Sequence, residues 1–456
     1  MITKKNISKL YFLFLVAHFL LWTLAPTLTN VNLPLDTIEA LAWSSNIDWG
    51  FSKHPPLSAF AVEVIYQIFG NQDWAYYSLS QVFVVIAFIA IFNFAKEFFN
   101  NINYAFFSIL LLEGILFYNY TTPEFNVNIS QLPFWSLSIL FTWRCIKHEK
   151  ISDYLCLGLF MGLGFLSKYL FIYLIIGIKL FFIYLLFNKK IKTFKFLITS
   201  LVALLIVSPH LIWLMNNDFV TLAYGVSRTN LDSSLWSHFL FPIIFIIKQI
   251  GILLPFFLLS FFLVKKIFIR KIRIDEKITF ILFIFILPIL LMILTSVIMG
   301  AEIRTMWMTP FYLLAGVSFV LIYKKNIETK NFKKFIFTFF ILFFLSPITY
   351  MVVSLTNDSK RTDYPGKEIA RLVQNKWDDN FFNDIKFVIG DEWFAGNLSY
   401  HLNSRPKWMI ELKEKTKNIN TNDGVIYTGN PKILKKICPG VFGTIKPVGY
   451  CMIGQN

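Results

Sequence analysis

Charged residues are scarce in this sequence. They make up 15% of its 456 residues, and hydrophobic residues make up 56%, whereas a soluble domain has about 25% charged and about 45–50% apolar residues. The scarcity excludes an ordinary soluble protein and indicates that lipid surrounds most of the chain. Acidic residues are fewer than basic ones: the sequence has 27 Asp and Glu and 43 Lys and Arg, which gives a net charge of +16. Because the basic residues fall between apolar segments, this charge indicates orientation in a membrane, and nucleic-acid binding is not expected.

Motifs for several chemistries are also missing. The sequence has no Walker loop, no Gly-x-Gly-x-x-Gly, no Gly-x-Ser-x-Gly and no Cys/His zinc set, so ATP-driven transport and serine hydrolysis lack support. Only four cysteines are present. Cys145 and Cys156 flank a predicted cytoplasmic loop and are expected to be inert. Cys438 and Cys451 could form a disulfide in an oxidising compartment, or they could be two buried thiols.

Long apolar runs are what the sequence has in abundance. A membrane-spanning helix needs about 20 apolar residues, and about eleven runs approach this length. They lie near residues 10–29, 76–95, 103–119, 131–146, 153–167, 169–187, 195–214, 243–264, 278–298, 305–323 and 334–355. The first run lacks a small-residue cleavage site, so we interpret it as a span and not as a signal peptide.

Orientation and domain organisation follow from charge and polarity. Lys and Arg crowd the first residues and alternate loops, which predicts a cytoplasmic N terminus, and an odd number of spans then puts the C terminus outside. Residues 1–355 are predicted to form an all-α polytopic membrane bundle. Residues 356–456 are polar, with short apolar runs alternating with helix-like pieces, which predicts a small extracytoplasmic α/β domain.

A polar cluster directly follows the first predicted span. Asp36 and Glu39 are three residues apart, so on a helix they would share one face, and Lys53 and His54 precede a Pro-Pro turn. One carboxylate could act as a general base, and two could hold a divalent cation, a dependence that the sequence leaves open. The alternative is that Asp36 only caps a short interfacial helix.

Glu124 is the third candidate catalytic residue. It lies in the next outward loop, which is short, and the residue is therefore predicted to stay near the membrane surface at a depth similar to that of Asp36. There it could bind an acceptor or a metal. The alternative is an acid of a solvated loop.

Few cations are predicted on the outer side, and they are candidates for binding a phosphate. A leaving phosphate ester needs positive charge to stabilise its developing negative charge. The candidates are Lys53, His54, Lys168, Lys248 and Arg304. The alternatives are snorkelling anchors or partners of lipid headgroups. His54 and His210 are isolated histidines and are weak candidates for metal ligands.

Several of these segments resemble a known family. The stretch Leu33–Leu57 resembles the first extracytoplasmic loop of bacterial GT-C superfamily membrane glycosyltransferases, in the branch related to protein O-mannosyltransferases and lipid A aminoarabinose transferase. The resemblance continues, in order, at Thr122–Asn126, Gly158–Tyr169, Ser208–Leu214 with Asp218 and Phe219, and Arg304 with Trp307 and Pro310. Together these segments cover roughly residues 10–325.

The resemblance implies an activity. It implies a sugar donor carried on polyprenyl phosphate, an acceptor hydroxyl outside the cytoplasm, and Asp36 as the base or an acceptor-binding residue. Many relatives carry adjacent Asp and Glu, whereas here Thr37 follows Asp36 and the second acid is Glu39. The acceptor is expected among envelope glycolipids such as lipid A or lipopolysaccharide core, other glycans or proteins, at the bacterial inner membrane. Attack from the far face of the sugar would invert its anomeric centre.

Two other functions are alternatives to a glycosyltransferase. A transporter or lipid flippase would place polar residues at the bilayer midplane and often has inverted repeats, whereas here the polar residues gather at one face. A non-catalytic envelope scaffold would have no reason to gather three acids and several cations at one depth. The lipid-linked glycosyltransferase is therefore the favoured hypothesis.

Overall fold

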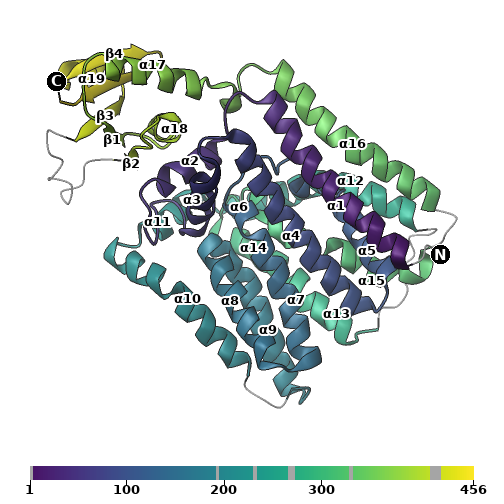
Figure 1. The fold of residues 1–456 in the computed structure, drawn as a ribbon. Helices are drawn as coiled ribbons and strands as arrows, with labels where there is room; N and C mark the ends of the chain where they lie inside the picture. The colour runs from purple at the N-terminus through teal and green to yellow at the C-terminus, as the bar shows by residue number, and fades with distance from the viewer. Residues whose placement is uncertain are drawn as a thin grey trace.

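The computed structural model describes residues 4–191, 195–229, 234–264, 273–327, 332–410 and 423–455. Most of these residues are helical, and a small sheet domain lies at one end of the helical bundle (Figure 1). Within these described ranges, seven helical segments are long and apolar enough to cross a membrane: Lys5–Thr29, Asp73–Phe99, Tyr169–Phe187, Phe196–Asn216, Ser237–Leu263, Glu276–Met299 and Lys333–Thr356. A bent pair, Thr305–Tyr312 and Ala315–Asn326, makes an eighth if it is one span. The predicted polytopic membrane bundle is confirmed, while the number of eleven spans stays a prediction.

The helices follow one another with short connections. The long ones are α1 (Lys4–Thr29), α4 (Asp73–Phe99), α9 (Ile172–Phe187), α10 (Phe196–Asn216), α12 (Ser237–Leu263), α14 (Leu287–Met299, continuing α13, Glu276–Ile281, and η3, Leu282–Ile286) and α16 (Phe332–Thr356). The shorter ones are α2 (Leu35–Ser44), α3 (Leu57–Phe69), α5 (Ile102–Leu112), η1 (Leu116–Tyr118), α6 (Val127–Ser130), α7 (Leu132–His148), α8 (Ile151–Ser167), η2 (Tyr169–Phe171), α11 (Val220–Ser227), η4 (Thr305–Tyr312), α15 (Ala315–Tyr323) and η5 (Lys324–Asn326).

The third predicted span is not one helix. The apolar run 103–119 divides at Glu113, because α5 ends at Leu112 and the chain turns into η1. Gly114 lies so close to α12 that an added Cβ would be 2.6 Å from the Cα atom of Phe256. The turn therefore depends on the close approach of the Gly114 backbone to α12, which a hydropathy profile does not show.

Glycines set the spacing of α8 and α10. A Cβ added to Gly158 or Gly162 would lie 2.7 Å from the Cβ atom of Val202 or Ile206. Small residues of this kind let two membrane helices approach closely, because lipid gives apolar side chains no reason to prefer each other. The close contact fixes the end of α8, where Lys168 follows.

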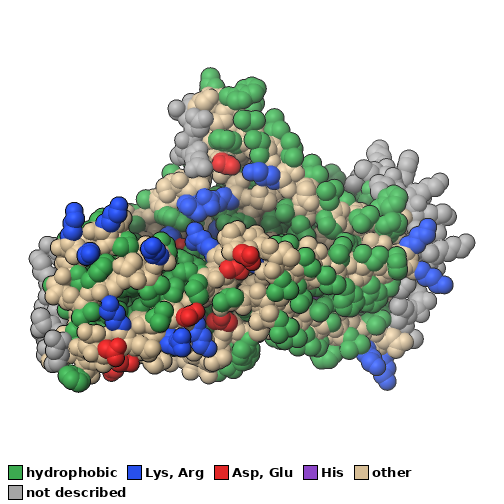
Figure 2. All heavy atoms as spheres, turned by 90° about the horizontal axis from the view of Figure 1, so that it is seen from above, with side chains coloured by type: hydrophobic (Ala, Val, Ile, Leu, Met, Phe, Trp, Pro, Cys, Tyr) green, Lys and Arg blue, Asp and Glu red, His purple; other side chains and the backbone are tan. Residues whose placement is uncertain are grey.

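Three short helices form a layer at one end of the bundle. Figure 1 places α2, α3 and α11 beside the C-terminal domain, and the N terminus at the opposite end. Large apolar side chains such as Phe337 and Leu355 remain exposed on α16, and hydrophobic side chains dominate one side of the molecule in Figure 2. An apolar outer surface is what a lipid-facing helix requires.

The C-terminal domain follows α16. It contains η7 (Arg361–Asp363), α17 (Gly366–Asp378), α18 (Phe394–His401), α19 (Pro431–Ile437), β1 (Ile385–Ile389), β2 (Lys407–Met409), β3 (Gly424–Gly429), β4 (Val441–Ile445) and β5 (Val448–Ile453). The strands form one sheet in the order β2-β1-β3-β5-β4, with β1 parallel to β2 and β3 and the other pairs antiparallel. The predicted small α/β domain is confirmed, and of the two alternatives for Cys438 and Cys451 the structure shows the disulfide.

The C-terminal domain packs directly on the first loop of the bundle. The α18 helix lies against α2, where Gly396 comes close to Ile38 and Ala42. Polar contacts across this boundary join Asn32 to Asn397 and His401, Asp73 to Tyr400, Glu63 to Arg405, and Ser45 to Trp408. The domain therefore covers the segment that carries Asp36.

Candidate functional site

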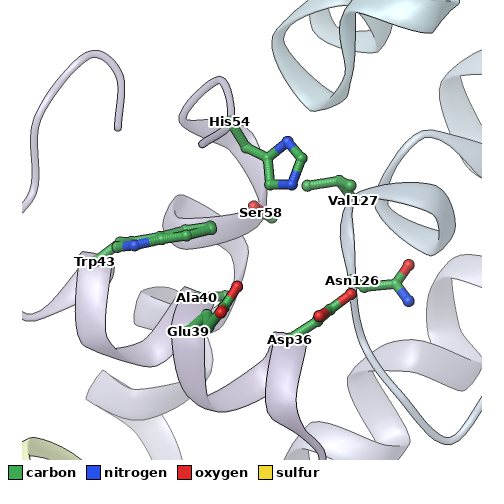
Figure 3. A pocket seen from close by; sticks show the side chains of 8 residues that line it. All are labelled: Asp36, Glu39, Ala40, Trp43, His54, Ser58, Asn126 and Val127. Carbon is green, nitrogen blue, oxygen red and sulfur yellow. The ribbon is translucent and has the colours of Figure 1, made fainter. Parts of the chain in front are cut away.

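A cavity opens where α2, the Pro-Pro turn and the start of α6 meet. It is small, and it is lined by Asp36, Glu39, Ala40, Trp43, His54, Ser58, Asn126 and Val127. Figure 3 shows the two carboxylates of α2 facing the His54 ring across this space. As the three-residue spacing predicts, both acids lie on one face of a helix and border the same cavity.

The α2 helix does not use Asp36 as a cap. Its N-cap residue is Pro34, no side chain caps it, and Asp36 lies in the first turn. The opposite face of α2 is apolar and buried, with Ile38, Leu41 and Ala42 inside. The capping alternative is therefore wrong, and burial of the apolar face turns the two acids toward the cavity.

Glu124 comes to the same place from a distant part of the chain. Its Oε1 atom accepts a hydrogen bond from the backbone N–H of Asp36 at 3.1 Å. The loop is fixed from α4, because Ser80 donates to the carbonyl of Thr122 at 2.5 Å and Gln81 donates to its hydroxyl at 3.0 Å. The alternative of a solvated loop acid is wrong, since Glu124 contacts the backbone of the first loop.

The two acids have different electrostatic surroundings. Burial raises the pKa of Glu124 to about 8, and the charges that add to this rise are the carboxylates of Asp36 and Glu39. Burial also raises the pKa of Asp36, but four cations oppose the rise: Lys168, Lys53, Arg228 and Arg361. Two close carboxylates do not readily ionise together. These surroundings favour a protonated Glu124 beside an ionised Asp36.

Lys168 is the most enclosed of the cations. It follows α8, is 6% exposed, donates to Asn128 Oδ1 at 2.6 Å, and lies over the ring of Trp307 at 5.1 Å. Burial lowers the pKa of Lys168 to about 7; the carboxylate of Asp36 opposes this fall, and Arg304 adds to it. Asp36, Lys168 and Arg304 therefore share one electrostatic site, although they come from separate segments.

Lys53 lies between two carboxylates. Its Nζ atom is 2.7 Å from Glu39 Oε1 and 3.3 Å from Glu392 Oε2, and Glu392 belongs to the C-terminal domain. Burial raises the pKa of Glu39, and the hydrogen bond from Lys53 opposes this rise. Lys53 thus pairs with acids of both domains.

His54 borders the cavity as a neutral ring. Burial lowers its pKa to about 3, and three nearby cations lower it further. Its ring meets the rings of Trp43 and Tyr224 edge to face. At neutral pH His54 can offer a hydrogen bond to a phosphate but no positive charge.

Lys248 stands apart from the other candidates. Its amine is 3.8 Å from Glu302 Oε1, and both side chains are nearly half exposed. No interaction recorded for the part of the chain that the structure describes joins Lys248 to Asp36 or Lys168. The sequence groups it with the other cations only because all five are predicted to lie outside.

Sequence reasoning missed three charged residues. Arg228 follows α11 and Arg361 begins η7, and both act on Asp36; Glu392 pairs with Lys53. Arg228 is one of the few outward cations, so the sequence did hold a signal for it. Arg361 and Glu392 reach the site only because the C-terminal domain packs on α2. Figure 2 shows Lys and Arg side chains gathered beside a hollow on the face toward this domain.

His210 holds the first loop in place. Its Nδ1 atom is 2.6 Å from the carbonyl oxygen of Trp49, and its Nε2 atom is 2.7 Å from the hydroxyl of Tyr169. Trp213, one turn further on α10, donates to Asp48 at 2.7 Å. Both ring nitrogens of His210 are thus engaged, and in the described ranges no group of three or more His, Cys, Asp or Glu could hold a metal.

Comparisons with known proteins agree with this architecture. Residues 53–213 match the family model described as dolichyl-phosphate-mannose-protein mannosyltransferase. The crystal structure of ArnT from Cupriavidus metallidurans bound to undecaprenyl phosphate is similar, with a TM-score of 0.66, 12% identity, and coverage of 96% of this chain and 98% of that chain. The apo structure of the same protein is also similar, with a TM-score of 0.53, 12% identity, and coverage of 97% of this chain and 98% of that chain. No curated protein sequence gives a significant match.

These similarities define the class of the fold. The chain has the fold of the solved ArnT structures, and the matches agree with the resemblance that its sequence motifs carry. The matched segment contains Lys53, His54, Glu124 and Lys168, whereas Asp36 and Arg304 lie outside it.

Proposed function

We propose that this chain is a membrane glycosyltransferase that moves a sugar from polyprenyl phosphate to an acceptor hydroxyl on the extracytoplasmic side of the bacterial inner membrane. One observation carries the proposal. Asp36 borders a cavity and is faced by four cations from four segments of the chain. One ionised acid within a surplus of positive charge suits a reaction that needs a base and releases a phosphate.

Asp36 would act as the general base. It would accept the proton of the acceptor hydroxyl as the oxygen attacks the anomeric carbon of the donor sugar, while the bond from that carbon to the phosphate oxygen breaks. A positioned base of this kind accelerates a reaction by about 10²–10⁴-fold. Attack opposite to the leaving phosphate would invert the anomeric centre.

Glu124 would support the base. Because its pKa is raised to about 8, it is protonated at neutral pH and adds no second negative charge beside Asp36. A neutral carboxyl can also donate a hydrogen bond to the acceptor. Glu39, held by Lys53, would orient the acceptor from the other side of the cavity.

The leaving phosphate would be held by Lys168, Arg304 and Arg228. Lys168 has a pKa near 7 in the free enzyme, and a bound phosphate would raise it, since an adjacent anion favours the ammonium form. Lys168 would therefore be most fully protonated when the polyprenyl phosphate carries its full negative charge. His54 would add a hydrogen bond from a neutral ring.

A divalent cation is a further proposal. Asp36 and Glu39 border the same cavity and could supply carboxylate oxygens, which are the ligands that Mg²⁺ and Ca²⁺ prefer. A third protein ligand is not found among the described His, Cys, Asp and Glu. Loss of activity with a chelator and recovery with one added ion would establish the dependence.

The orientation of the protein follows from the loops. With the basic ends of the helices in the cytoplasm, the cavity and the C-terminal domain face the periplasm. Nucleotide sugars are absent there, so the donor has to arrive on a lipid. We propose an envelope glycolipid as the acceptor, with lipid A or lipopolysaccharide core as the first to test.

Donor turnover tests the proposal. Purified protein in liposomes would be given polyprenyl phosphates carrying a hexose, a hexosamine or a pentose together with an envelope glycolipid extract, and free polyprenyl phosphate would be measured by mass spectrometry. We expect release with one donor, and a fall of at least about 10²-fold for Asp36→Asn. The exposed acid Asp358 provides the control, Asp358→Asn. Full activity of Asp36→Asn would overturn the base, and a wild type inert to all donors would contradict the function.

A further inference from the structure

One acid of the C-terminal domain reaches the active-site loop. Glu392 Oε2 lies 3.3 Å from Lys53 Nζ, whose other partner is Glu39 Oε1 at 2.7 Å. Glu392 is 8% exposed, and its second oxygen, Oε1, is buried with no hydrogen-bond partner. Lys53 is therefore the side chain that fixes this carboxylate.

The C-terminal domain holds Glu392 rigidly. The residue follows β1 at the end where β1 runs parallel to β2 and β3, the edge at which such sheets place functional side chains. Asp391 accepts hydrogen bonds from the N–H groups of Trp393 and Phe394 at 2.9 Å and so fixes the start of α18. Because α18 packs on α2, Glu392 has a defined position relative to Glu39.

We propose that Glu392 is a positioning residue of the active site, which holds the Lys53 amine against Glu39 so that the C-terminal domain completes the catalytic cavity. This inference rests on the proposed function and extends it across the domain boundary. It also changes the role expected for Lys53. An amine already placed between two carboxylates sets the position and charge of Glu39, and leaves the phosphate to Lys168 and the arginines.

The charges around this group support the proposal. Glu39 faces Lys53, Asp36 and Glu392, and Lys53 faces both glutamates and Tyr224. Without the Lys53 bridge, three carboxylates would lie near one another, and burial raises the pKa of two of them, Asp36 and Glu39. With it, the Lys53 amine opposes the rise in the pKa of Glu39 and holds its carboxylate at the cavity that Asp36 shares.

A double-mutant cycle between Glu392 and Lys53 tests the proposal. We expect Glu392→Gln to lower kcat about tenfold with little change in the KM for the donor, since a tenfold loss corresponds to one weakened charge-assisted contact. Glu392→Asp keeps the charge and should recover part of the loss. In a Lys53→Met background, Glu392→Gln should cost nothing further, because its effect passes through the amine.

The control variant breaks another contact across the same boundary. Glu63 pairs with Arg405 at 3.5 Å and does not touch Lys53, so Glu63→Gln should alter docking while its kcat stays within about twofold of wild type. The pH profile is the second readout. Glu392 holds the Lys53 amine, which opposes the rise in the pKa of Glu39, so Glu392→Gln should move the acid limb of kcat to higher pH, whereas Glu63→Gln should not.

Three outcomes would overturn the inference: wild-type kcat and pH profile in Glu392→Gln, an equal loss in Glu63→Gln, or additive losses in the cycle. If Lys53→Met is inactive, the double-mutant cycle is measured by thermal unfolding temperature instead. Coupled shifts in that temperature would support the Glu392–Lys53 contact, and additive shifts would contradict it. If the wild type is active and Glu392→Gln has the same kcat and pH profile, this inference alone is contradicted. A wild type that turns over no donor contradicts the proposed function instead.

Discussion

Two groups of polar, ionisable side chains in this molecule are arranged in opposite ways. Inside the bundle, His18 Nδ1 lies 3.0 Å from Glu113 Oε2, and both side chains are 0% exposed. The remaining ring nitrogen of His18 and the remaining oxygen of Glu113 have no hydrogen-bond partner. At the rim, Asp36 is surrounded by cations from several segments and borders an open cavity.

The difference lies in charge balance. His18 and Glu113 contact each other and are fully buried. The pair therefore fixes how α1 and the end of α5 meet and cannot bind a ligand. At the rim the positive charges outnumber the ionised acids once Glu124 holds its proton. A surplus of positive charge beside a cavity needs an anion, whereas the His18–Glu113 pair is fully buried and out of the reach of a ligand.

Removal of a rim cation should damage transfer most. We expect Lys168→Met to lower kcat/KM for the polyprenyl-phosphate donor by about 10²-fold, the cost of losing one group that stabilises developing charge. The measurement is initial release of polyprenyl phosphate. Unchanged kinetics would return Lys168 to the role of a membrane anchor.

Glu124 should set the alkaline limb of the pH profile. Its pKa of about 8 means that it is protonated below pH 8 and ionises as the pH rises through that value. If the neutral form is the active one, kcat of the wild type falls above pH 8, and Glu124→Gln, which cannot ionise, lacks that limb. Saturating donor is needed, because bound phosphate keeps Lys168 charged. An unaltered limb in the variant would exclude Glu124 as its source.

The interior pair should affect stability and leave chemistry alone. His18→Leu leaves the Glu113 carboxyl buried without its partner, which costs about 3–5 kcal/mol in the stability of a fold. We expect a lower thermal unfolding temperature in detergent and an unchanged kcat per folded molecule. The double variant His18→Leu with Glu113→Leu should recover stability, and a kcat loss in it would show that the pair serves the reaction.

Lys248 should have the smallest effect. It is an outward cation like Lys168, but it is half exposed and pairs with Glu302 at 3.8 Å. Exposed pairs of this kind contribute about 0–1 kcal/mol. Lys248→Met should therefore match the wild type in transfer and in unfolding temperature, which makes it the control for Lys168→Met; a donor defect would place it within the site.

Much of the site could be predicted from local sequence. The three-residue spacing of Asp36 and Glu39 predicts one face of a helix, and α2 confirms it. The positions of Lys168 at the end of α8 and Glu124 in an outward loop follow from where the apolar runs end. The end of α5 at Leu112 could not be predicted, because the close approach of Gly114 to α12 leaves no mark in hydropathy.

The sequence by itself determined that this is a polytopic membrane protein with a small C-terminal α/β domain, because solvent preference and helix period act residue by residue. Only the tertiary structure decided that Arg228, Arg361 and Glu392 join Asp36 and Lys53, and that Lys248 does not. Those contacts depend on how α18 packs on α2 and where α11 ends. Such long-range packing brings together residues whose separation along the chain carries no information about their distance in space.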